Sequence, residues 1–148
     1  MTAIAFIHYL GQPSDHVLLT PTGVVALEVV NLAGSFAYRR GRWKESMTIG
    51  RALRYLVEPR VIDPVVLAAA VADDLQLWFS RHLSSPVSVP MKVLTVFTHP
   101  AVELELDQGN VPALVLAKLR KQATITGTRL SPVVYEDLAA CLERAAVG

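Results

Sequence analysis

The chain has 148 residues, of which 52% are hydrophobic, and a formal net charge of +1. Its length is that of a single domain, and its near-neutral charge excludes a global electrostatic attraction to nucleic acid or an anionic membrane. A mean hydropathy of +0.39 is high for a soluble domain, so we expect a homo-oligomer or larger assembly to cover apolar surface. The single cysteine, Cys141, excludes an internal disulfide, and a cytoplasmic location is the default.

No stretch of the sequence favours a membrane-spanning helix. The longest apolar run, Val61–Phe79, is interrupted by Asp63, Pro64, Asp73 and Asp74, and charges are costly inside a bilayer core. We therefore expect no membrane partner. No linker or internal repeat divides the chain, which indicates a single domain over residues 1–148.

The first half of the chain favours β-strands. Apolar segments alternate with Gly, Pro and polar residues, which is the pattern of strands separated by turns. Pro suits the first position of a turn and Gly its left-handed position, as in Pro21-Thr22-Gly23. An antiparallel meander with a tip at Arg40-Gly41 is expected over about Ala3–Tyr9, His16–Thr20, Val24–Val30, Ser35–Arg39 and Arg42–Glu45.

The second half favours helices with two strands between them. Asp63 before Pro64 predicts a helix start, and the apolar turns that follow indicate a helix buried against the sheet or a second copy. Ser131 before Pro132 predicts another start. This order predicts a mixed α/β fold with its sheet covered by helices. The expected elements are a helix Val65–His82, strands Met91–Thr98 and Val102–Leu106, and helices Val111–Gln122 and Pro132–Val147.

Charge patterning refines two of these elements. Glu103, Glu105 and Asp107 alternate with apolar residues, which predicts a half-exposed strand with a solvated acidic face. Three cations close the helix predicted at Val111–Gln122, where positive charge complements the helix dipole. These cations are Lys118, Arg120 and Lys121.

Two carboxylates stand on the predicted hairpin, Asp15 at its start and Glu28 on its second strand. If the loop has two residues, Asp15 lies opposite Glu28 with Cβ atoms about 5 Å apart, and the pair can hold a divalent metal such as Mg²⁺ or Mn²⁺. If it has three residues with a bulge at Gly23, the register moves by one. Alternatively, Asp15 stabilises the preceding turn and Glu28 pairs with His16 or an arginine of the meander.

One ordered set of residues runs through these elements: Asp15-His-Val-Leu-Leu19, Gly23-Val-Val25, Glu28, Asn31, Gly34, Trp43, Asp63-Pro64 and Met91–Phe97. This set resembles the NERD (nuclease-related) domain of the PD-(D/E)xK nuclease superfamily. The resemblance covers roughly residues 3–107 and depends on ordered spacing over several elements. It leaves a C-terminal part, residues 108–148, expected to be helical and outside the match.

The resemblance implies a restriction-endonuclease-like mixed sheet with an antiparallel meander, flanked by helices. It implies Asp15 as the metal-binding aspartate and Glu28 as the second carboxylate of the (D/E)xK element, so both are candidate catalytic and metal-binding residues. Three departures weaken catalysis. Val30 replaces the lysine and can neither orient water nor stabilise charge on a phosphate. Leu67 replaces a glutamine, and before the first strand we expect no counterpart of the family's leading helix.

The basic hairpin is the candidate nucleic-acid contact. Clustered guanidinium groups beside an aromatic ring suit phosphate binding and base stacking. The alternative is an ordinary solvated hairpin tip, whose charges prevent edge-to-edge association. The residues concerned are Arg39, Arg40, Arg42, Trp43 and Lys44.

Three functions remain open. The first is a catalytically degenerate nuclease-related domain that binds DNA or acts in protein interactions or structure. The second is an active Mg²⁺-dependent DNA endonuclease in which Asp15 and Glu28 bind the metal and another residue replaces the lysine. The third is a self-associating structural α/β domain in which the acidic pair is incidental.

Overall fold

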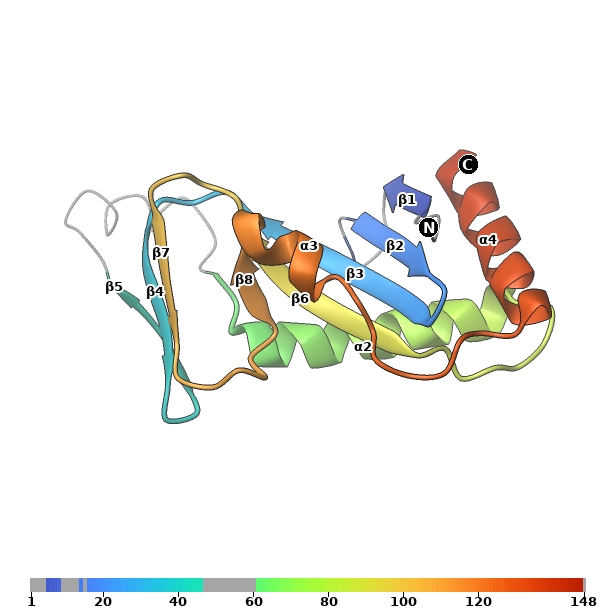
Figure 1. The fold of residues 1–148 in the computed structure, drawn as a ribbon, viewed down its shortest axis with the longest axis horizontal. Helices are drawn as coiled ribbons and strands as arrows, with labels where there is room; N and C mark the ends of the chain where they lie inside the picture. The colour runs from blue at the N-terminus through green and yellow to red at the C-terminus, as the bar shows by residue number, and fades with distance from the viewer. Residues whose placement is uncertain (1–4, 9–13, 15, 47–60, 148) are drawn as a thin grey trace.

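The computed structural model describes residues 5–8, 14, 16–46 and 61–147 (Figure 1). The described part is a mixed α/β fold with two sheets and three α-helices. The elements are β1 (Ala5–His8), β2 (His16–Thr20), β3 (Gly23–Val30), β4 (Gly34–Arg39), β5 (Arg42–Ser46), α2 (Pro64–His82), β6 (Met91–Phe97), β7 (Val102–Leu106), β8 (Ala113–Val115), the 3₁₀-helix η1 (Leu116–Lys118), α3 (Leu119–Gln122) and α4 (Pro132–Val147).

The larger sheet has five strands in the order β1-β2-β3-β6-β8. Antiparallel hairpins join β1, β2 and β3, whereas β6 runs parallel to β3 and β8 parallel to β6. Helix α2 lies in the connection that returns the chain from one end of β3 to the other, as a parallel strand requires. The predicted interior position of the strand at Met91–Thr98 is therefore confirmed.

The smaller sheet has three strands in the order β5-β4-β7. The predicted hairpin of β4 and β5 is confirmed, and β7 pairs parallel with the other edge of β4. The expectation of one continuous meander is wrong at a single junction, because β3 does not pair with β4. Strand β6 occupies the free edge of β3, so the chain leaves the first sheet after Val30 and starts the second at Gly34.

Helix α2 begins with the N-cap that the sequence predicts. The Asp63 carboxylate accepts a hydrogen bond of 2.9 Å from the backbone N–H of Val65, and Pro64 occupies the first helical turn. Helix α2 and helix α4 cover the same face of the larger sheet (Figure 1). We call this layer the α2-side core; its buried members include Val17, Val24, Ala26, Val71, Leu75, Phe79, Val93, Leu138, Cys141 and Leu142.

Two further clusters complete the interior. The α3-side core lies on the opposite face of the larger sheet and includes Leu18, Val25, Leu27, Leu94, Val96, Leu114 and Ala123. The inter-sheet core lies where the two sheets meet and is built around Phe36, Tyr38, Phe97, Val111 and Ala113. Every residue from Gly23 to Leu27 is buried, which explains the continuous apolar run in this strand.

The helix expected at Val111–Gln122 is wrong, and with it the wholly helical C-terminal part at residues 108–148. Residues 113–115 form strand β8 instead, and α3 comprises only Leu119–Gln122. The backbone N–H of Thr95 donates a 2.9 Å hydrogen bond to the carbonyl of Pro112, which begins the pairing with β6. The open edge of β6 thus overrides a local pattern that fits a helix and a buried strand equally well.

Helix α2 is less covered than expected. Its buried residues follow one stripe, while Val65, Val66 and Leu77 are exposed. At its C-terminal end the Trp78 ring stacks on His82 with ring centroids 4.4 Å apart.

A search of the described residues for a helix with the length and hydropathy of a membrane span finds none.

Cys141 belongs to the α2-side core, as the sequence indicated. Its side chain is buried between α4 and the sheet, and burial raises the pKa of its thiol above the ordinary value. This thiol therefore behaves as an apolar core group.

Gly23 provides a test of the hairpin that positions β3. Its φ of +151° is unfavourable for other residues, and an added Cβ would lie 2.3 Å from the backbone oxygen of Pro90. Gly23→Ala is expected to lower the free energy of unfolding by about 2 to 4 kcal/mol, from backbone strain and overpacking together. Urea denaturation followed by circular dichroism measures this loss.

Gly109→Ala is the matched control. A Cβ at Gly109 has no neighbour within 4 Å, so its effect should stay within about 0.5 kcal/mol. Equal stability of the two variants would contradict the tight packing of the turn against Pro90.

Candidate functional site

Glu28 lies in the second half of β3, where the strand leaves the fully buried interior. The register pairs it with Thr95 on β6, and its neighbours on the same face are Ala26 and Val30. Ala26 belongs to the α2-side core, so Glu28 points to the side of the sheet that α2 covers. Glu28 is half-buried and Thr95 is buried. A carboxylate thus stands at the margin of an apolar layer.

The β2–β3 hairpin has the two-residue loop that was one of the two alternatives. Thr20 pairs with Gly23 and His16 pairs with Leu27, which leaves Pro21 and Thr22 as the loop. Asp15 lies outside the described residues. His16 shares the face of Leu27, so it points to the side of the sheet opposite Glu28, as strand alternation predicted.

Val30 packs in apolar surroundings. It pairs with Phe97 across the parallel ladder and lies against the inter-sheet core. Leu67, at the glutamine position of the resemblance, packs against the α2-side core. Both positions that depart from the nuclease pattern therefore contribute to hydrophobic packing in this protein.

A metal site has limited support among the described side chains. Within residues 5–8, 14, 16–46 and 61–147, no group of three or more His, Cys, Asp or Glu side chains is arranged to hold a metal ion. Glu28 supplies one carboxylate at the end of β3. A two-carboxylate site for Mg²⁺ or Mn²⁺ would need Asp15, of which the structure describes nothing.

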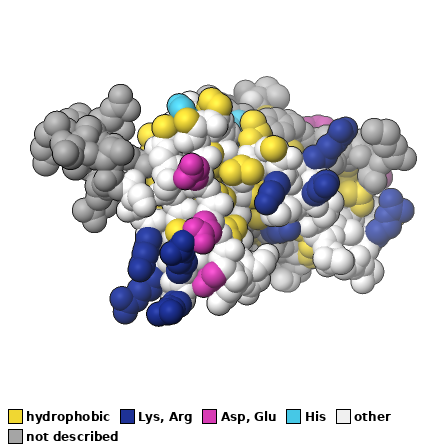
Figure 2. Space-filling model, turned by 60° about the vertical axis from the view of Figure 1, so that its left-hand side comes forward, with side chains coloured by type: hydrophobic (Ala, Val, Ile, Leu, Met, Phe, Trp, Pro, Cys, Tyr) yellow, Lys and Arg dark blue, Asp and Glu magenta, His cyan; other side chains and the backbone are white. Residues whose placement is uncertain are grey.

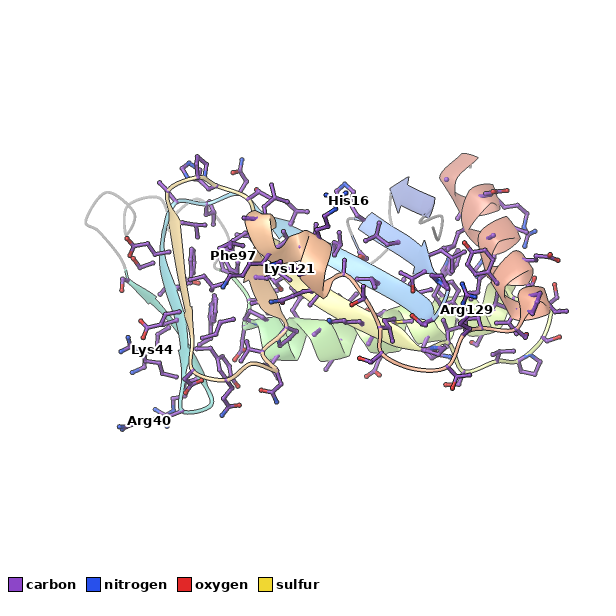
Figure 3. All side chains as sticks on the ribbon, in the orientation of Figure 1. His16, Arg40, Lys44, Phe97, Lys121 and Arg129 are labelled. Carbon is purple, nitrogen blue, oxygen red and sulfur yellow. The ribbon has the colours of Figure 1, made fainter. Side chains whose placement is uncertain are left out.

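The predicted cations gather around the β4–β5 tip. Arg40 and Lys44 project at the end of the molecule farthest from α4 (Figure 3). Arg40 has a left-handed φ of 52°, and its backbone N–H donates to the Asp107 carboxylate over 2.7 Å. The Arg39 guanidinium forms an ion pair with Glu105 at 2.5 Å. Exposed cations and acids therefore lie side by side on this part of the surface (Figure 2).

Trp43 does not share the surface of these cations. It pairs with Tyr38, whereas Arg42 and Lys44 lie on the opposite face of β5. The Trp43 ring stacks on Phe36 with centroids 5.6 Å apart and belongs to the inter-sheet core. The expected combination of an aromatic ring with guanidinium groups on one surface is wrong, although alternation along β5 alone could have separated them.

The position of the acidic strand β7 beside the β4–β5 hairpin was not predicted from the sequence. The sequence predicted the acidic face of β7 but not its place, because Glu105 becomes a neighbour of Ala37 only through long-range parallel pairing. Lys118 lies in the last turn of η1, and Arg120 and Lys121 lie in the last turn of α3, so these cations do close helical turns as expected. The helix that they close is much shorter than the one predicted at Val111–Gln122.

Comparisons with known proteins give no match, whether with protein-family models, with curated proteins or with solved structures. The NERD-like identification and its site residues therefore stay predictions.

The two faces of β5 give a stability test. Trp43→Ala removes a ring from the inter-sheet core and should cost about 2 to 4 kcal/mol of unfolding free energy. Lys44→Ala removes an exposed side chain on the other face and should change it by less than about 0.5 kcal/mol. Chemical denaturation measures both unfolding free energies. Equal losses in the two variants would contradict the placement of Trp43 and Lys44 on opposite faces of β5.

Proposed function

We propose that this protein is a catalytically degenerate nuclease-related domain that acts by binding nucleic acid and does not cleave it. The observation that carries the proposal is the environment of β3. Glu28 keeps a carboxylate at the end of the strand, while Val30, the position of the lysine in the resemblance, packs against Phe97 and the inter-sheet core. A valine there provides no cation for the scissile phosphate.

The arrangement of the larger sheet supports the restriction-endonuclease-like fold as part of this proposal. Three antiparallel strands are followed by helix α2 and then by a strand parallel to β3. The resemblance placed its meander, long helix and late core strand in this order along the chain. The extra strands β4, β5 and β7 form a separate sheet that carries the basic tip.

The nucleic-acid contact is assigned to the tip of the β4–β5 hairpin. Arg40 and Arg42 are exposed on either side of Gly41, and guanidinium groups at a protruding turn can reach backbone phosphates. Arg39 is partly neutralised by Glu105. We therefore expect weak, salt-dependent and sequence-independent binding.

Cleavage assays test the degenerate site. The wild type should leave supercoiled plasmid intact in Mg²⁺ or Mn²⁺. Val30→Lys should gain Mg²⁺-dependent nicking, because the lysine stem can lie along the apolar cluster while its amine reaches the carboxylate side. Gel electrophoresis with EDTA controls measures both.

The control is Val30→Lys combined with Glu28→Gln, in which nicking should disappear. Efficient cleavage by the wild type would refute degeneracy and support the active endonuclease. A folded Val30→Lys variant without nicking would refute the idea that the carboxylate half of a nuclease site persists.

Fluorescence anisotropy with labelled DNA tests the contact surface. Removing both tip cations, Arg40→Ala/Arg42→Ala, should weaken binding by roughly tenfold at low salt and reduce the salt slope by about 1 to 2. The matched control, Arg120→Ala/Lys121→Ala, removes the same charge from α3 and should bind as the wild type. Equal weakening by both variants would mean that only net charge matters, and no binding by the wild type would refute the contact.

A further inference from the structure

The outward face of the smaller sheet has an ordered charge pattern that nucleic-acid binding does not explain. Strand alternation and register place nine residues on this face, which we call the outer face. The opposite face carries Phe36, Tyr38 and Trp43 and is covered by the inter-sheet core. The outer face consists of Arg42, Lys44 and Ser46 from β5, Ser35, Ala37 and Arg39 from β4, and Glu103, Glu105 and Asp107 from β7 and the residue after it.

The two edge strands contribute opposite charges to this face. The β5 edge carries Arg42 and Lys44, the β7 edge is acidic, and the central strand has the small residues Ser35 and Ala37 followed by Arg39. The outer face contains a shallow hollow of about 240 Å³ whose lining includes Ala37, Lys44 and Glu105. The two edge strands lie about 10 Å apart, which is twice the spacing of neighbouring strands.

In two of the three rows of this face, the charges at the two ends also match. Ala37 pairs with Lys44 on one side and with Glu105 on the other, so these three residues form one row across the sheet. Arg39 pairs with Arg42, and Asp107 follows β7 with its backbone N–H bonded to the carbonyl of Tyr38. Arg42 and Asp107 therefore end the next row. Each of the two rows begins with a cation and ends with a carboxylate.

Such a face is complementary to itself. A two-fold axis parallel to β4, lying between two facing copies, exchanges the basic and acidic edges and keeps each row at its own level. Lys44 then faces the partner subunit's Glu105, and Arg42 faces the partner subunit's Asp107. A two-fold axis across the strands would instead place the basic edge over the basic edge and the acidic edge over the acidic edge. The axis parallel to β4 leaves one like-charge contact, between Arg39 and the partner subunit's Arg39, and each of these guanidinium groups is paired with Glu105 of its own copy. Contacts of this reciprocal kind define an isologous dimer.

We propose that the outer face binds a second copy of this chain in this orientation. Ser35 and Ala37 let the two faces approach along most of the central strand, and the long charged side chains at the edges span the gap. Arg39 is already paired with Glu105 within one copy, and Ser35 donates a 2.9 Å hydrogen bond to Glu103, so the acidic edge is held in place. The described residues give Arg42 and Lys44 no ion-pair partner within their own copy.

The dimer is weak because the face is small. Three strands of about five residues cover a few hundred Å², below the roughly 800 Å² per partner of standard interfaces. Exposed ion pairs contribute little individually and are screened by salt. We therefore expect association at tens to hundreds of micromolar at low ionic strength, and dissociation as salt is added.

Charge reversal with sedimentation equilibrium tests this dimer on the full chain. Lys44→Glu and Glu105→Lys, measured separately at about 20 mM salt, should each weaken self-association at least tenfold, because each creates two repulsive contacts. An equimolar mixture of the two variants should associate as the wild type does, because every crossed contact is then attractive. A single chain with both changes should do the same.

Lys121→Glu is the control, with the same charge change on α3, and it should self-associate as the wild type does. A wild type that stays monomeric at several hundred micromolar would overturn the proposal. Single variants that associate normally, or a mixture that fails to recover, would overturn it too. Circular dichroism identifies any variant that does not fold. If a single variant does not fold, the chain that carries both Lys44→Glu and Glu105→Lys still tests the proposal, because it should self-associate as the wild type does. Nucleic acid is absent from the sample, so the outcome is independent of the proposed function.

Discussion

Strand β3 is the constraint on which the rest of the fold depends. It pairs with β2 on one edge and β6 on the other, and residues 23–27 are buried on both faces. Its N-terminal end is fixed by Gly23, which packs directly on the backbone of Pro90 at the start of β6. The backbone N–H of Val24 donates a 2.8 Å hydrogen bond to that same Pro90 carbonyl. The turn at Gly23 therefore fixes both the β2–β3 hairpin and the start of β6, the strand that the crossover through α2 leads to.

The end of β3 combines one carboxylate with apolar packing. A metal-dependent nuclease combines carboxylates for the ion with a cation for the developing charge, and both must face a cavity that water can enter. In this protein one face of the strand passes from Ala26 through Glu28 to Val30, two of which pack in apolar layers. Hydrophobic packing between the two sheets occupies the position next to the carboxylate. The proposed degeneracy depends on this apolar packing of Val30 beside Glu28.

Features encoded by neighbouring residues were predictable, and those created by distant pairing were not. The Asp63 cap and the hairpins at Pro21-Thr22 and Arg40-Gly41 depend on a few consecutive residues, and their elements were expected within one or two positions. Strand β8 forms only because the edge of β6 is open beside it. The candidate site divides in the same way. Alternation along β2 and β3 indicated that His16 and Glu28 face opposite sides of the sheet, whereas the acidic neighbours of the β4–β5 hairpin come from the β4–β7 ladder.

The two tryptophans of the chain occupy different parts of the fold. Trp43 stacks on Phe36 in the inter-sheet core, and Trp78 stacks on His82 at the end of α2. Indole emission depends on local polarity and on quenching groups in ring contact, so the two rings report separately on sheet docking and on the helix end. Variants with a single tryptophan would therefore show whether the smaller sheet separates from the larger one before the whole protein unfolds. The chain carries its own spectroscopic reporters of the junction between its two sheets.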